Sequence, residues 1–139
     1  MMATINYFFF YSYVGLVVLA GLWGAFIYPV LDFSFLLQMN IESLPEYSRV
    51  NLLSQYRFLR ALELGYGLYS LYFLKDIFSK PKYNQLFLSI MGLGIMARLF
   101  SWVQDGTPSD LFIFFLIYEA LGWVAIFIYS LKMRIYHAN

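Results

Sequence analysis

Residues 111–131 read LFIFFLIYEALGWVAIFIYSL and contain one charged side chain, Glu119. A helix of about 20 apolar residues rises about 30 Å, which matches the hydrocarbon core of a bilayer. In lipid, a helix also satisfies all of its own backbone hydrogen bonds. The stretch therefore predicts a transmembrane helix, with lipid rather than water as its solvent.

Three more stretches of the chain have the same character. They run from about Tyr7 to Val30, from Tyr56 to Leu74 and from Tyr83 to Val103. The whole composition agrees, because 62% of the residues are hydrophobic and only 12% are charged, at a mean hydropathy of +0.67. Such a chain has too few polar groups to cover a water-facing surface. The sequence predicts an all-α membrane protein, a four-transmembrane-helix bundle forming a single domain over residues 1–139.

Charge and cysteine content exclude several classes of function. The net charge is +1 and no basic run occurs, so the electrostatic footprint of a nucleic-acid-binding protein is missing. The chain has no cysteine, and its one histidine, His137, lies in the C-terminal tail. Thiolate and imidazole are the usual ligands of zinc, iron–sulfur clusters and haem. We expect no metal and no cofactor.

Basic residues near the ends of the predicted spans indicate the orientation. Lys75, Lys80 and Lys82 lie between spans two and three, and Lys132 and Arg134 follow span four. Cytoplasmic loops carry an excess of lysine and arginine. We therefore expect both termini on the cytoplasmic side.

The connection between spans three and four is rich in residues that end and start helices. Gly106, after Asp105, suits the left-handed conformation at the end of a helix. Thr107 suits the N-cap of the next helix, and Pro108 suits its first position. These residues predict a tight helical hairpin.

Four charged residues fall inside the predicted spans. They are Arg60 and Glu63 in span two, Arg98 in span three and Glu119 in span four. A charged side chain at the centre of a bilayer costs at least about 2.5 kcal/mol, so it requires a partner or a wet cavity. Counted along the helices, Glu63, Arg98 and Glu119 lie roughly 10–13 Å below the non-cytoplasmic surface. We expect the four to neutralise one another, with Arg98 contacting Glu119 or Glu63.

Aromatic and small residues near these charges could form the wall of a cavity. The expected wall residues are Tyr66, Gly94, Trp102, Phe115 and Trp123. Three interpretations remain open for the charged cluster. It could be a pair of structural ion pairs, the polar floor of a pocket for the head of a mostly apolar ligand, or part of a proton path.

Several motifs together resemble a known family. They are Leu59-Arg60-Ala61, the Gly65–Leu68 run, the Gly92–Leu99 run, the Asp105–Ser109 hairpin and Glu119. They resemble an uncharacterised bacterial family of small four-helix membrane proteins, the domain-of-unknown-function family 4345, within the DoxX/DoxD-like superfamily. The resemblance implies a four-helix bundle in the bacterial inner membrane and marks Arg60, Arg98, Asp105, Gly106, Pro108 and Glu119. Some DoxX-type proteins are associated with quinone-linked oxidation. The resemblance does not imply redox chemistry for this chain, because the chain has neither a cysteine nor a histidine in its spans.

The favoured functional hypothesis is a non-enzymatic membrane protein. It would be either an accessory subunit of a membrane complex or a binder of a lipid-like or quinone-like molecule, with the Arg/Glu cluster as its polar floor. One alternative is a membrane enzyme that uses Glu119 or Glu63 as general acid or base. Another alternative is a proton-coupled carrier. Small residues in span one would also allow the protein to form a homodimer.

Overall fold

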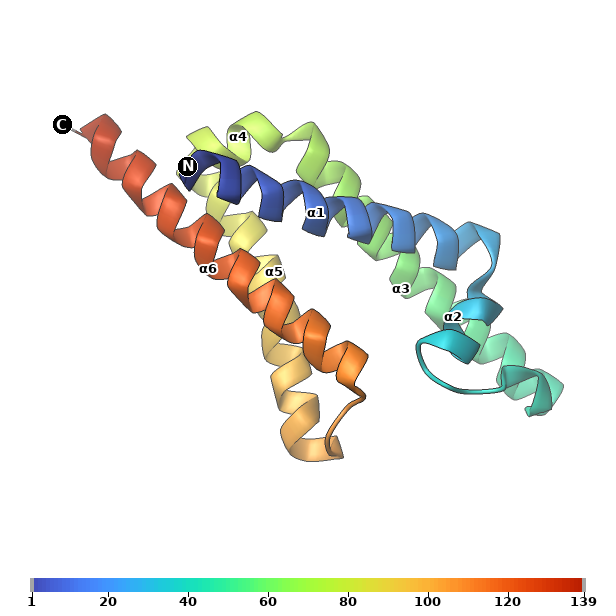
Figure 1. Ribbon diagram of the computed structural model, residues 1–139. Coiled ribbons are helices and arrows are strands. Elements are labelled where there is room, and N and C mark those ends of the chain that lie inside the picture. The colour runs from blue at the N-terminus through green and yellow to red at the C-terminus, as the bar shows by residue number, and fades with distance from the viewer. Residues whose placement is uncertain (1, 139) are drawn as a thin grey trace. The chain divides into compact units, whose positions relative to one another are not determined.

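The computed structural model describes residues 2–138, and it describes side chains for residues 4–132 (Figure 1). The described residues form helices joined by short connections and contain no β-strand. The elements are α1 (Met2–Leu22), a π-helical turn η1 (Trp23–Ile27), α2 (Pro29–Phe35), a 3-10 turn η2 (Ile41–Ser43), α3 (Glu46–Tyr72), α4 (Leu74–Ser79), α5 (Pro81–Asp105) and α6 (Asp110–Ala138).

Three segments are long and apolar enough to cross a membrane. They are Thr4–Ile27, Pro81–Asp105 and Asp110–Lys132, which agree with predicted spans one, three and four. Helix α3 is longer than the predicted span two, with 27 residues, and it is much more polar. The helical fold is confirmed, and the three apolar helices indicate a membrane protein. The count of four spans stays a prediction.

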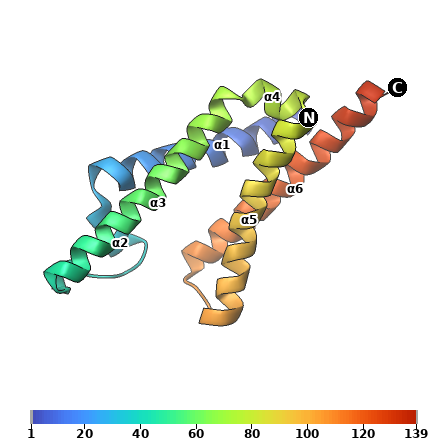
Figure 2. The same cartoon turned by 180° about the vertical axis from the view of Figure 1, so that it is seen from behind.

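The chain forms two compact units, and the first comprises the described parts of Met1–Tyr13 and Tyr72–Asn139. Its centre is a hairpin of α5 and α6, which lie side by side in both views (Figures 1 and 2). The core is aromatic: the ring of Phe10 lies 5.3 Å from the rings of both Phe78 and Phe87. A buried polar contact also joins the hairpin, because Asn84 Nδ2 donates to Ser130 Oγ at 2.7 Å.

The turn between α5 and α6 differs in detail from the prediction. Gly106 has a φ of 109°, a value that side chains disfavour, so a glycine is required where α5 ends. Helix α6 begins at Asp110, two residues later than predicted, and Pro108 is therefore not in its first turn. Thr107 does not provide the predicted cap, because its hydroxyl oxygen accepts a 3.3 Å hydrogen bond from the indole of Trp102.

The second unit, Val14–Leu71, packs the end of α1 against α3. A Cβ on Gly21 would lie only 2.6 Å from Leu64 N, so the two helices touch backbone to backbone at this point. The apolar helix ends at Ile27, and Tyr28 leaves the helical conformation with φ −145°. Pro29 is the first residue of α2, so the first apolar helix ends three residues before the predicted limit of span one at Val30.

Candidate functional site

The four intramembrane charges of the prediction form two ion pairs, one in each unit. Arg60 and Glu63 belong to α3, and Arg98 and Glu119 join α5 to α6. Of the two carboxylates expected as partners of Arg98, Glu119 is the one that contacts it. Each arginine has its own set of partners.

Arg60 is surrounded by three oxygen-bearing side chains. Its Nη1 lies 2.6 Å from Glu63 Oε2, its Nε donates to the Tyr56 hydroxyl at 2.8 Å, and its Nη2 lies 3.6 Å from Asp32 Oδ2. The same hydroxyl donates to Asp32 Oδ2 at 2.8 Å. The Arg60, Tyr56, Asp32 and Glu63 side chains, called the Arg60 network below, thus bind one another around the guanidinium.

Sequence reasoning missed two members of this network. Tyr56 lies one helical turn before Arg60, so the i, i+4 spacing on α3 could have identified it. Asp32 follows the predicted end of span one at about Val30, outside the four predicted spans. It lies on α2, 24 residues before Tyr56, and no periodicity in the sequence links the two.

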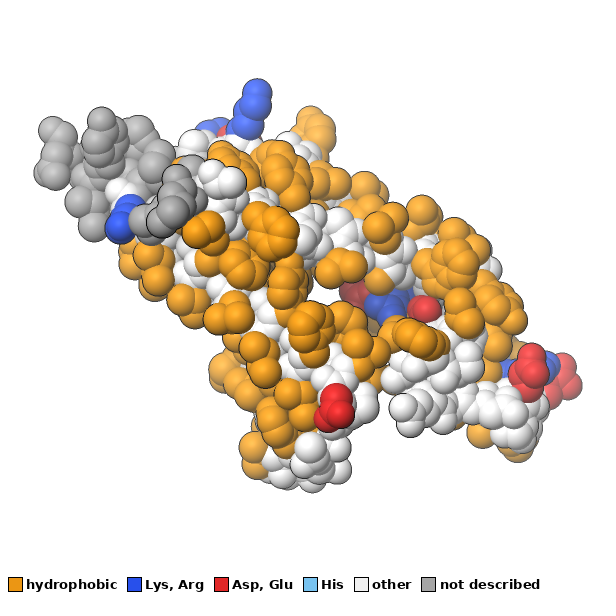
Figure 3. Space-filling view, in the orientation of Figure 1, with side chains coloured by type: hydrophobic (Ala, Val, Ile, Leu, Met, Phe, Trp, Pro, Cys, Tyr) orange, Lys and Arg blue, Asp and Glu red, His pale blue; other side chains and the backbone are white. Residues whose placement is uncertain are grey.

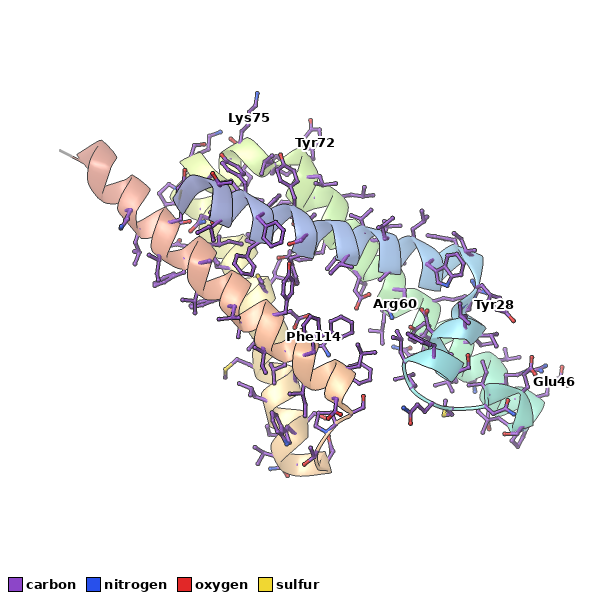
Figure 4. The ribbon with its side chains drawn as sticks, viewed as in Figure 1. Tyr28, Glu46, Arg60, Tyr72, Lys75 and Phe114 are labelled. Carbon is purple, nitrogen blue, oxygen red and sulfur yellow. The ribbon has the colours of Figure 1, made fainter. Side chains whose placement is uncertain are left out.

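A glycine allows the Arg60 network to close. Figure 4 shows Arg60 on α3 beside α2. A Cβ on Gly24 would lie 2.7 Å from Arg60 Cγ and 2.9 Å from Asp32 Oδ2. The side chains of Arg60 and Asp32 are only 15% and 14% exposed, because the π-helical turn covers them at this distance. This arrangement is suited to holding helices together.

Arg98 has a simpler environment in the α5–α6 hairpin. Its Nε lies 3.1 Å from Glu119 Oε2, and its Nη2 donates to Glu119 Oε1 at 3.4 Å. The guanidinium carbon also lies 5.9 Å from the centre of the Phe112 ring. Glu119 is 18% exposed, whereas Arg98 remains 38% exposed. Among the described residues, none accepts a hydrogen bond from Arg98 Nη1.

The exposed side of Arg98 faces a groove between α5 and α6. The groove has a volume of about 390 Å³. Its lining consists of Ala97, Arg98, Ser101, Trp102, Pro108, Phe112 and Leu116, and this set of residues is called the Arg98 groove below. One charged group thus lies among mainly apolar and aromatic walls, the usual composition of a small-molecule site.

The predicted wall residues are distributed differently. Trp102 lines the Arg98 groove as expected. Phe115 does not line the groove, but its ring lies 6.4 Å from the ring of Phe112, which does. Trp123 instead connects α6 to α5, because its indole nitrogen donates a 2.8 Å hydrogen bond to Leu88 O. Gly94 is not among the residues that line the Arg98 groove, and a Cβ there would meet nothing within 4 Å. Tyr66 belongs to α3 in the other unit.

Apolar side chains surround both sites. Figure 3 shows hydrophobic side chains along the visible face of α6. Large exposed hydrophobic residues of the hairpin include Leu93, Met96, Phe100, Phe114, Ile117 and Leu121. This surface fits a lipid environment, in which apolar side chains face outward. Among the described residues, no group of three or more histidine, aspartate or glutamate side chains is arranged to hold a metal ion.

Apolar helices that are long enough to span a bilayer, with ion pairs among their polar residues, define a small helical membrane protein. The chain belongs to the family defined by a domain of unknown function, DUF4345, whose family model matches residues 8–130. This match confirms the family resemblance of the motifs from Leu59 to Glu119 and extends it over α1. Neither the curated proteins nor the solved structures contained a match to the chain.

Proposed function

We propose that this protein is a non-enzymatic membrane protein that binds a lipid-like or quinone-like molecule in the Arg98 groove. The observation that carries the proposal is the incomplete pairing of Arg98. One carboxylate occupies two of its nitrogen atoms, while the side chain remains 38% exposed and lines the groove. An arginine that served only to join helices would be expected to be enclosed, as Arg60 is.

The chemistry and size of the groove support an amphiphilic ligand. Binding sites for small molecules typically have volumes of about 300–1,000 Å³, with apolar walls and a few polar groups that orient the ligand. The Arg98 groove, at about 390 Å³, lies at the lower end of this range. It can hold a polar head and the first part of a hydrocarbon chain, and the rest of the chain would lie along the apolar surface of the hairpin.

The proposed topology adds α3 as a fourth span, with both termini in the cytoplasm of a bacterium and the protein in its inner membrane. The contact between Arg60 and Glu63 supports this assignment, because two opposite charges on the same helix offset each other. A wider relationship to DoxX-type proteins is part of the same proposal.

The absence of cysteine makes the topology simple to test. Single cysteines introduced at residues 79–82 should react with impermeant reagents only from the cytoplasm, and those at 106–109 only from outside. The reverse pattern would overturn the orientation.

Native mass spectrometry of the gently solubilised protein tests the ligand proposal directly. We expect the wild-type protein to retain a small amphiphile. Arg98→Gln should lose it, and Ala97→Phe, which fills the groove from α5, should lose it without removing a charge. Arg49→Gln is the matched control, because Arg49 lies in the first turns of α3 and does not line the groove.

Two results would contradict the proposal. One is a wild-type protein that carries no small molecule in any mild detergent. The other is equal retention by Arg98→Gln and Arg49→Gln. A co-purifying protein, with no bound amphiphile, would instead support an accessory subunit of a membrane complex.

A further inference from the structure

We infer that the Arg98 groove selects a neutral head group that accepts hydrogen bonds, such as the carbonyl of an ester or ketone, over an anionic or cationic head. The inference rests on the proposed function and specifies the class of ligand. It follows from the charges and the hydrogen-bonding groups that the hairpin places at the groove.

The first argument concerns charge. Glu119 already neutralises Arg98 through contacts of 3.1 and 3.4 Å. An anionic head would therefore bring a second negative charge to a single arginine, and the site as a whole would become negative. A net charge within a membrane span is costly. A neutral head adds no net charge.

The second argument concerns donors and acceptors. Arg98 Nη1 is a donor that no described residue uses, and arginine has no acceptor. Ser101 directs its proton to Asp105 Oδ2 at 2.8 Å, and the Trp102 indole makes a long, 3.3 Å hydrogen bond to Thr107 Oγ1. The indole is a donor as well. The groove therefore offers chiefly donors, which a carbonyl oxygen can accept.

A cationic head is disfavoured for the same reasons. The lining of the groove contains no carboxylate, and its one charged side chain is the arginine. An ammonium group would lie close to the guanidinium with no acceptor of opposite charge among the lining residues. Like charges at short distance repel strongly in a medium of low dielectric constant.

A series of probes with one hydrocarbon chain and different heads tests this inference. Methyl octadecanoate, octadecanoate and octadecylamine would be offered in equal amounts to the delipidated protein, and retention would be compared by native mass spectrometry. At about pH 9 the carboxylic acid is ionised and arginine keeps its charge. We expect the ester to exceed both charged probes by about tenfold, the ratio that about 1.4 kcal/mol represents.

Glu119→Gln provides the sharper test, because it removes the negative charge that offsets Arg98. The preference should then reverse, with octadecanoate retained more strongly than the ester. Glu46→Gln makes the same chemical change in the first turn of α3 and should keep the wild-type preference. If Glu119→Gln does not fold, the series on the wild-type protein decides the question alone.

The outcomes separate the two proposals. Retention of octadecanoate or octadecylamine by the wild-type protein at or above the level of the ester would overturn the selectivity and leave ligand binding intact. An unchanged preference in a folded Glu119→Gln protein would do the same. Retention of none of the three probes would contradict the proposed function itself.

Discussion

The two arginine sites use the same kind of ion pair in different ways. Arg60 binds a tyrosine and two carboxylates, and Gly24 lets the backbone of the π-helical turn approach closely. Arg98 binds one carboxylate and lines an open groove. The difference shows that an arginine in a helical membrane protein has to be judged by its full set of partners and by its exposure, because its charge and its position in the sequence alone make the two look alike.

This comparison also assigns an energetic role to each site. A buried ion pair contributes little net stability over an apolar replacement, but removing one partner leaves a charge that is expensive to bury. Substitution of Arg60 or Asp32, whose side chains are 15% and 14% exposed, should therefore destabilise the protein, whereas Glu63 is 47% exposed and should matter less. Substitution of Arg98, which is 38% exposed, should cost less stability than that of Arg60 and should affect binding more than folding.

The largest expected effect is that of Arg60→Leu. The substitution leaves Asp32 and Glu63 without their cation, so the free energy of unfolding should fall by about 3–5 kcal/mol. Thermal or denaturant unfolding in detergent micelles measures the loss. Arg49→Leu, the same change elsewhere on α3, is the control. A loss no larger than that of the control would remove the distinction between the two arginine sites.

The next effect concerns the close packing that encloses the Arg60 network. Gly21→Ala should destabilise the protein by about 1–3 kcal/mol, because the added Cβ would meet the backbone of α3 at 2.6–2.9 Å. Gly65→Ala should be neutral or slightly stabilising, because nothing lies within 4 Å of its Cβ position and alanine favours a helix. Equal unfolding midpoints for the two variants would show that α1 and α3 do not touch at Gly21.

A double-mutant cycle should give a smaller value for the Arg98 pair. Arg98→Leu and Glu119→Leu each strand one charge, whereas the double variant strands none. We expect a coupling energy of about 1 kcal/mol, reduced by the exposure of Arg98. Thermal unfolding of the four proteins supplies the cycle. Strictly additive losses would mean that the two side chains are not paired in the folded protein.

The smallest effect should come from the exposed pair of Asp76 and Lys80 at the end of α4. Their 2.7 Å contact raises the pKa of the Lys80 ammonium above its usual value, chiefly through the hydrogen bond to Asp76. Because the folded-state pKa is raised, any stabilisation is present at neutral pH and is lost only as the pH rises through that pKa. NMR titration of labelled lysine should show the pKa fall in Asp76→Asn, with no measurable change in melting at neutral pH. A pKa that does not change in Asp76→Asn would show that the contact is absent in solution.

The helices of the hairpin could be predicted well from the sequence, because long apolar runs have few alternatives in a membrane. The need for glycine at 106 was also predictable, since only glycine readily adopts a positive φ at the end of a helix. The end of the first apolar helix at Ile27 was harder to predict. Pro29 is compatible with both the end of one helix and the start of the next, and the sequence does not distinguish the two.

The site was predictable only in part. Depth along the helices predicted that Arg98 would pair with Glu119 or Glu63, and it did not distinguish between these two carboxylates. The identity of the groove residues depended on how α6 is rotated about its axis. Leu116 and Phe115 lie three and four residues before Glu119, so both share its helix face, and only the structure shows that Leu116 lines the groove.

The short turn at 106–109 and the pair Arg98–Glu119 have a consequence for biosynthesis. If α5 left the translocon alone, the lipid would meet an isolated guanidinium with no counter-ion. If α5 and α6 leave together, the 3.1 Å contact can form before either helix meets lipid, so that Arg98 enters the bilayer with its counter-ion. Joint insertion of α5 and α6 is therefore expected to be favoured over insertion of α5 alone.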